Sequence, residues 1–146
     1  MDVTATGKDQ TVDAIERAAK TVADYNDAAD GNWSVSEAFW STSAAGDVAT
    51  QVWTNGSDAN FAAGSDAVTG AVDLLGTVAA GQVTVEEGAW TFGGTGQLRL
   101  GTGFAVADGL GMQTFGANTQ VVQTSSTTWD IGLNSTVQVD GNFDGV

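Results

Sequence analysis

Pairs of apolar residues dominate the chain from Gly81 to Phe143, and a new pair begins roughly every six to nine residues, between glycines and small polar residues. In most pairs a single residue separates the two apolar ones, which is the two-residue period of a strand with one buried face. The pattern therefore predicts about eight short strands. These pairs are Val83/Val85, Trp90/Phe92, Leu98/Leu100, Phe104/Val106, Met112/Phe115, Val121/Val122, Trp129/Ile131 and Val137/Val139.

Before Gly81 the spacing changes, because apolar residues now recur three and four positions apart, as on one face of a helix. One such stripe runs from Asp9 to about Ala23, and another from Asp66 to Val78. Between them, Ser34-Val35-Ser36-Glu37 has the form of a capping box, in which a serine and a glutamate satisfy backbone N–H groups at a helix start. That helix would end near Asn55-Gly56, a left-handed stop. The pattern thus predicts three helices.

Together these patterns predict an α+β chain with a helical docking or oligomerisation region over residues 1–80 and a glycine-punctuated β domain over residues 81–146. The strand series is compatible with a sandwich, a barrel, a β-solenoid or an intertwined trimeric fibre. Strands of about four residues leave edges that need partners, and closure or oligomerisation supplies them. We therefore expect the chain to assemble.

The amino-acid composition limits the kinds of catalytic and metal-binding site that the chain can form. The 146 residues include no cysteine and no histidine, which removes thiolate sites, disulfides and the usual general base near neutral pH. The adjacent carboxylates Glu86 and Glu87 would point to opposite faces of a strand, so they do not form the pair that glycoside hydrolysis needs. We predict no catalytic residues and no enzyme activity.

The net charge limits the kinds of partner that the chain can bind. Eighteen acidic residues stand against four basic ones, for a net charge of −14, and such a chain repels phosphate groups. We therefore predict no nucleic-acid partner and no membrane partner. The first residues, Met1 to Thr4, lack the basic and apolar regions of a signal peptide, so synthesis without an export signal is the expectation.

Residues 26–37 resemble an EF-hand calcium loop. The candidate metal ligands are Asn26, Asp30, Ser34 and Glu37, with a glycine at the sixth position. However, Asn26 replaces the usual aspartate at the first position, and Ala28 at the third position supplies no side-chain oxygen. The alternative, which we favour, is a tight Asp-Gly turn between two helices. No cofactor other than calcium at this loop is predicted.

A helix, an Asp-Gly turn and the Ser-x-x-Glu motif, spanning about Val12 to Phe39, also resemble small helical proteins of tailed-phage structural gene clusters. In those proteins a similar turn joins helices without a metal. The resemblance implies a virion accessory protein, such as a capsid decoration or fibre subunit. The expected partners are further copies of the chain, as in a trimer, and a larger scaffold such as a capsid. The expected location is a virion or an extracellular assembly.

Aromatic residues in the first part of the chain are the predicted interface anchors: Trp33, Phe39, Trp40 and Trp53. Two other functions stay open. Exposed tryptophans would suit a carbohydrate-binding or adhesin module, although Trp90 and Trp129 alternate with apolar residues and are expected to be buried. Alternatively, acidic residues of neighbouring copies would share cations in a calcium-stabilised surface-layer or filament subunit.

Overall fold

A computed structural model describes residues 9–11, 28–38, 40, 51–61, 69–86 and 88–145 of the chain. Every regular element among these residues is a strand. The described residues contain no helix long and apolar enough to span a membrane. The strands are β1 (Asp9–Thr11), β2 (Ala28–Trp33), β3 (Asp58–Phe61), β4 (Thr69–Leu74), β5 (Thr77–Val85), β6 (Ala89–Gly94), β7 (Gln97–Val106), β8 (Gly111–Phe115), β9 (Gln120–Gln123), β10 (Thr128–Ile131), β11 (Ser135–Val139) and β12 (Asn142–Asp144).

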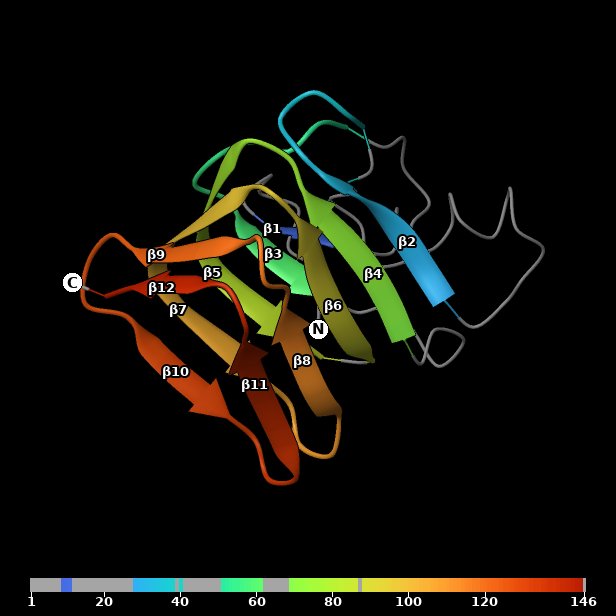
Figure 1. Cartoon of the computed structure of the whole chain (residues 1–146), viewed down its shortest axis with the longest axis vertical. Coiled ribbons are helices and arrows are strands. Elements are labelled where there is room, and N and C mark those ends of the chain that lie inside the picture. The colour runs from blue at the N-terminus through green and yellow to red at the C-terminus, as the bar shows by residue number, and fades with distance from the viewer. Residues whose placement is uncertain are drawn as a thin grey trace.

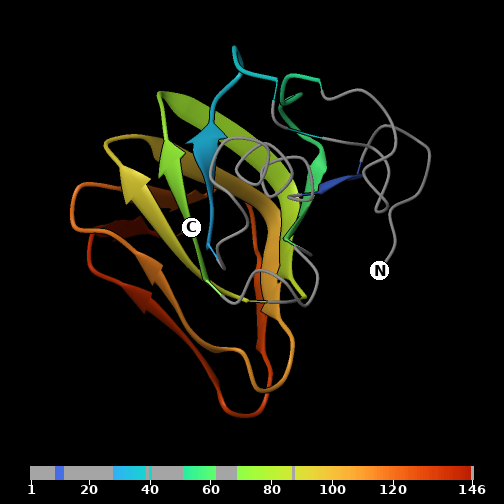
Figure 2. The same cartoon turned by 90° about the vertical axis from the view of Figure 1, so that its right-hand side faces the viewer.

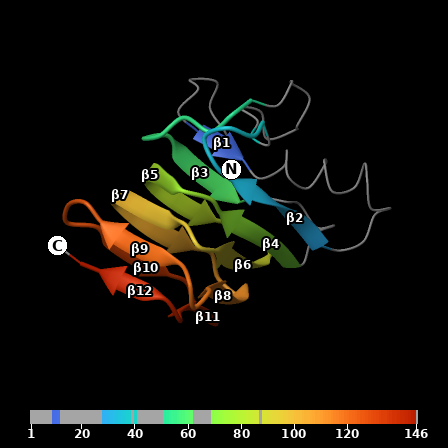
Figure 3. The ribbon, with the colours of Figure 1, turned by 45° about the horizontal axis from the view of Figure 1, so that its top comes forward.

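The strand ladders are parallel and form two sheets (Figure 1). One sheet has the order β1-β3-β5-β7-β9-β12, with β10 also paired to β7, and the other has the order β11-β8-β6-β4-β2. Figure 3 shows the strands of each sheet lying one beside the next in this order. From β3 and β4 onward, paired strands lie about 20 to 25 residues apart in the chain, since Thr77 pairs with Gln97 and Gln97 with Gln120. The first pairs are further apart, because Asp9 pairs with Asp58 and Ala28 with Thr69. The chain therefore winds in successive coils as a β-solenoid.

Each complete coil turns a corner within one long strand. The pairing of β5 with β7 shifts register between Ala80 and Gln82, so the strand bends at Gly81. Its two halves continue different ladders: Thr77–Ala80 lies beside the part of β7 that leads to β9, and Gln82–Val85 beside the part that leads to β10. Gly81, where the amino-acid composition changes, is thus a corner of a coil.

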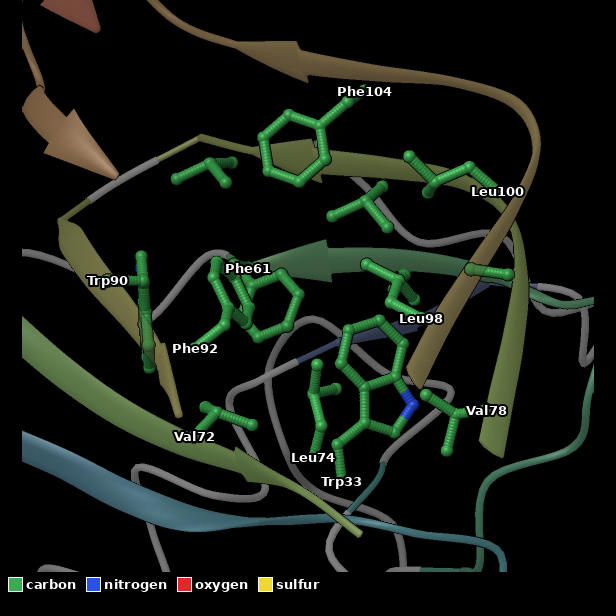
Figure 4. Packing of buried hydrophobic residues seen from close by; sticks show 14 of the residues in the cluster. Trp33, Phe61, Val72, Leu74, Val78, Trp90, Phe92, Leu98, Leu100 and Phe104 are labelled. Carbon is green, nitrogen blue, oxygen red and sulfur yellow. The ribbon is translucent and has the colours of Figure 1, made fainter. Parts of the chain in front are cut away.

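Inward-facing apolar side chains fill the interior and stack from coil to coil (Figure 4). Phe92 stacks on Phe115 with ring centroids 4.7 Å apart, and Phe104 stacks on Trp129 at 5.1 Å. The alternation of apolar and polar residues after Gly81 is therefore the alternation of interior and exterior, and the predicted β-rich character is confirmed.

Strand β8 departs from the predicted pattern. Met112 is 48% exposed on the outside, whereas Gln113 is fully buried among the apolar residues. The Gln113 amide makes two hydrogen bonds there: its Oε1 accepts from Trp90 N at 2.7 Å, and its Nε2 donates to the Gly88 carbonyl at 3.0 Å. The backbones of β6 and β8 pair directly only from Thr91 onward. Before that point the Gln113 side chain supplies the hydrogen-bond partner that the β8 backbone does not offer to Trp90 N.

The predicted helical N-terminal part is wrong for the described residues. Where the first helix was predicted, residues 9–11 form strand β1. Where the third was predicted, residues 69–74 form β4 and residues 77–78 begin β5. Residues 34–37 form bends in the second predicted helix, where Ser34 Oγ accepts from Ser36 N at 3.3 Å. Residues 12–27 and 41–50 lie outside the described part.

The physical reason is visible at β4 and β5. Val72 and Leu74 are buried while Ala71 and Leu75 are exposed, so a two-residue period operates where a helical stripe was inferred. Alanine and valine are small and apolar enough to fit either period. Parallel pairing with β6 and β7 decides between them, because tertiary packing overrides weak local propensity.

Candidate assembly surface

The residues of the calcium-like loop come together only in part. Asn26 lies outside the described residues, and Asp30 belongs to strand β2, where only its backbone is described. Ser34 Oγ donates to Glu37 Oε2 at 3.4 Å, and Asn32 Nδ2 donates to the two carboxylate oxygens of Glu37 at 3.2 and 3.0 Å. Within the described ranges no group of three or more acidic side chains gathers to hold a metal. Calcium binding at this loop stays a prediction.

The predicted interface aromatics lie inside the chain. Trp33 and Trp40 are fully buried, Trp53 is 2% exposed, and Phe39 lies outside the described residues. The three indole rings form a cluster, which we call the tryptophan cap, with centroids 4.8 to 5.1 Å apart. Two of the rings also contact Phe61, at 5.6 and 5.7 Å. The cap fills the interior at the β2 and β3 end, and a docking role for these rings stays untested.

The other two tryptophans also point inward. Trp90 is 1% exposed, and Trp129 is half-buried with its ring stacked on Phe104 at an interplanar angle of 16°. Sugar rings stack on exposed aromatic faces, and none of the five tryptophans, all of which are described, is an exposed residue. The carbohydrate-binding alternative therefore gains no supporting observation.

The last described coil consists of β10, β11 and β12, drawn in orange and red in Figure 1. Among the described strands, each of the three pairs on one side only, with β7, β8 and β9 respectively. Figure 2 shows the same coil from the side. The opposite edges of the three strands have no partner strand among the described residues, and unpaired strand edges are templates for further pairing.

The hydrogen bonds to the preceding coil fix which residues face these open edges. Even-numbered residues donate backward, as Asp140 N does to the Phe115 carbonyl at 2.9 Å and Gly132 N to the Val106 carbonyl at 2.8 Å. In a parallel ladder, alternate residues of a strand bond to one neighbour while the residues between them point the other way. The backbone groups that face the open edges thus belong to Trp129, Ile131, Ser135, Val137, Val139 and Phe143.

All of these residues except Ser135 carry apolar side chains. Four are half-buried against the core, and Phe143 is 45% exposed. The rings of Phe143 and Trp129 contact each other at 5.6 Å, and Leu133 in the following turn is 76% exposed. The Trp129 Nε1 atom is buried without a hydrogen-bond partner among the described residues. Apolar surface and open backbone edges therefore coincide at this end, which we call the open end.

The open end is acidic. Asp130 on β10, Asp140 after β11 and Asp144 on β12 are exposed, and the chain has no lysine or arginine beyond Arg99. Asp144 Oδ2 accepts from Gln120 Nε2 at 2.7 Å, and Asp140 Oδ1 accepts from Gln138 Nε2 at 2.7 Å. Both partners are neutral amides, so the negative charge of the last coil is not compensated within it.

The coils and their stacked interior define the described part of the chain as a β-solenoid-like arrangement. No family model, no curated protein and no solved structure matches the chain.

Sequence reasoning predicted unpaired edges in general but not their place, and it did not select Phe143 or Leu133. One signal was available: the inward alternation continues through Val137 and Val139 to Phe143 without a polar residue replacing an inward one. The apolar pattern thus marks the inward residues of the last described coil, Val137 and Val139 among them.

Proposed function

We propose that the chain is a non-enzymatic structural protein that self-assembles, as a virion accessory subunit of the capsid-decoration or fibre type. Its proposed partners are further copies of itself and a larger protein scaffold such as a capsid. The observation that carries the self-assembly part is the open end, where backbone edges and half-buried apolar side chains coincide. The virion setting is the narrower part, and it derives only from the sequence motif over residues 12–39, because Asp30 and Gly31, the expected turn of that motif, lie within strand β2.

The strength of such a contact can be bounded. Fully burying a large apolar side chain contributes about 1.5–3 kcal/mol, so completing the burial of five partly buried ones contributes on the order of 5 kcal/mol. Association costs roughly 4–15 kcal/mol in lost freedom of motion, so the apolar term alone leaves the contact marginal. Each backbone hydrogen bond across the edges would add about 0.5–1.5 kcal/mol net. We therefore expect weak, concentration-dependent assembly in the absence of a scaffold.

Light scattering on the purified chain tests this proposal. The expected result is a mass that rises above 14.8 kDa as the concentration increases, with calcium and with chelator alike. A mass that rises only with calcium would instead favour the calcium-stabilised filament. A mass of one chain at all concentrations up to several hundred micromolar would contradict self-assembly.

A matched pair of variants localises the contact. Phe143→Ser removes an exposed ring from the open end, whereas Leu75→Ser removes a side chain of 40% exposure from the turn between β4 and β5. We expect the first to weaken assembly by about tenfold, equivalent to 1.4 kcal/mol, and the second to leave it unchanged. Equal effects of the two variants would place the contact elsewhere.

A further inference from the structure

We propose that Asn55 is a site of spontaneous deamidation, and that the fold sets the rate by holding both reacting groups against strand β5. The sequence holds a single Asn-Gly pair, Asn55-Gly56, and both residues are exposed to water. In such a pair the backbone nitrogen of the glycine attacks the side-chain amide of the asparagine. The attack is easiest before glycine, because glycine has no Cβ to hinder it. The chemistry is independent of the self-assembly proposed above.

The reaction needs no reagent other than water. The Gly56 nitrogen loses its proton and forms a bond to Asn55 Cγ, and the Cγ–Nδ2 bond breaks, which releases ammonia and leaves a cyclic succinimide. Water then opens the ring at one of its two carbonyl groups. One opening gives aspartate. The other gives isoaspartate, in which the main chain runs through the former side chain and gains a methylene group.

A single residue, Ala79, holds both of the groups that react. Gly56 N donates to the Ala79 carbonyl at 2.8 Å, and Asn55 Oδ1 accepts from Ala79 N at 2.9 Å. A nitrogen whose N–H group points at Ala79 cannot lose its proton and turn toward Cγ while that bond lasts. The buried Trp53 also donates to the Ala79 carbonyl, through its indole N–H at 3.1 Å. Ring closure therefore requires residues 53–56 to separate from β5, which we call opening of the corner.

The residues that follow fasten the same corner. Gly81 N donates to the Ser57 carbonyl at 2.9 Å, and Gln82 N donates to Asp58 Oδ1 at 2.9 Å. A reaction that requires local opening proceeds at its rate in the open form multiplied by the open fraction, when opening and closing are fast. We therefore expect Asn55 to deamidate slowly in the folded chain and quickly in the unfolded one.

A second pair of the same kind has the same arrangement. Gly109 N donates to the Leu133 carbonyl at 2.7 Å, and Asp108 Oδ1 accepts from Leu133 N at 2.8 Å. Gly56 and Gly109 both have positive φ angles, of 94° and 77°. At two corners, then, one residue of the next coil holds the glycine N–H group and the side-chain oxygen before it. The restraint on Asn55 is thus part of the way in which the coils stack.

The two products should affect the corner differently. Aspartate at position 55 keeps an oxygen that can accept from Ala79 N. Isoaspartate lengthens the main chain before Gly56 N, so the hydrogen bonds to Ala79 and Gly81 cannot all be kept. We expect hydrogen exchange at the Ala79 and Gly81 amides to be at least tenfold faster in the isoaspartate form than in the variant Asn55→Asp.

Peptide mapping by mass spectrometry tests both the site and the restraint, with the full chain incubated at pH 8 in native buffer and in 6 M guanidinium chloride. We expect residue 55 to deamidate at least tenfold faster in the denaturant. Trp53→Phe removes one hydrogen bond to the Ala79 carbonyl, whereas the Trp40 indole N–H has no partner among the described residues. In native buffer Trp53→Phe should therefore react about fivefold faster than Trp40→Phe, equivalent to about 1 kcal/mol, and the two should react equally in the denaturant.

Three results would count against the proposal. Equal rates in native buffer and in denaturant for the unchanged chain would overturn the restraint, and this comparison does not depend on the folding of a variant. Faster deamidation of another asparagine in the denaturant would overturn the choice of Asn55. A folded Trp53→Phe variant that reacts no faster than Trp40→Phe would overturn the role given to the Ala79 carbonyl. Self-assembly, which light scattering measures, would stand or fall separately.

Discussion

The hydrogen bonds of Gln113 offer the sharpest test of the fold. This side chain is fully buried, and it joins Trp90 N on β6 to the Gly88 carbonyl of the preceding turn, at 2.7 and 3.0 Å. Leucine at position 113 has a similar size and would remain among apolar neighbours. It would nevertheless remove both the acceptor of one backbone group and the donor to another, so Gln113→Leu isolates the polar contribution.

The magnitude follows from the cost of losing hydrogen bonds in a buried place. A backbone group left without its partner there costs about 1–3 kcal/mol, and two groups are affected. Burial of the apolar leucine side chain returns part of this cost. We expect a net loss of about 2–4 kcal/mol in the free energy of unfolding, which for a chain of this size lowers the melting temperature by roughly 5–12 °C.

Urea unfolding followed by tryptophan fluorescence measures this loss, with Gln138→Leu as the matched control. Gln138 is an exposed glutamine on β11, and its amide donates only to Asp140 among the described residues, so the same substitution there should change stability by less than about 0.5 kcal/mol. Hydrogen exchange at the Trp90 amide provides a local readout. If Gln113→Leu unfolded at the wild-type urea concentration with normal protection of that amide, the role assigned to Gln113 would be refuted.

Three further predictions use similar comparisons. Gly96→Ala should lower the free energy of unfolding by about 2 kcal/mol or more, because the added Cβ would lie 2.5 Å from the Leu74 carbonyl oxygen. Gly101→Ala is the control, because its Cβ meets nothing closer than 3.5 Å, and thermal unfolding of both variants compares them. Trp53→Phe removes an indole N–H that donates to the Ala79 carbonyl at 3.1 Å, whereas the Trp40 indole N–H has no partner among the described residues. In urea unfolding, Trp53→Phe should therefore lower the free energy of unfolding by about 1 kcal/mol more than Trp40→Phe does. Asn55→Ala removes the oxygen that accepts from Ala79 N at 2.9 Å and should speed exchange of that amide, whereas Asn55→Asp should keep its protection.

The part of the fold that sequence could predict is the alternation after Gly81. Val83 and Val85, or Leu98 and Leu100, leave little choice because a polar or small residue stands between two bulky ones and glycines bound the run. The coil architecture was not determined, because it depends on which strands pair. The pairing of Thr77 with Gln97 is a contact between distant residues, and local pattern does not distinguish a solenoid from a sandwich or a barrel.

The helix predictions failed where side chains are small. Ala71, Val72 and Leu75 have helical spacing, but the structure exposes Ala71 and Leu75 and buries Val72 and Leu74. The turn at Gly76 separates two strands. The exchange of Met112 and Gln113 has a different cause. A buried glutamine is costly unless both ends of its amide are satisfied, and the partners Trp90 and Gly88 are more than twenty residues away, so only the folded coil shows that they are there.

The candidate surface was predictable in kind but not in place. Short strands imply open edges, and this expectation followed from strand length alone. The aromatic residues chosen as anchors were judged by type, yet Trp33, Trp40 and Trp53 are buried and Phe143 is exposed. Whether an aromatic side chain is exposed depends on where its coil lies in the stack. A residue that another coil covers is buried, and a residue of the same type without such cover stays exposed.

A parallel solenoid has no intrinsic end, because every coil presents the next one with the same edges and the same interior. At one end of this chain the tryptophan cap fills the interior, and at the other the interior side chains stay partly exposed. An exposed apolar edge would promote open-ended aggregation unless something opposes it, and charge on edge strands is a common means. Asp130, Asp140 and Asp144 place one carboxylate at or next to each of the three open strands. These carboxylates therefore oppose pairing at the three strand edges, and we expect any association through them to depend on ionic strength.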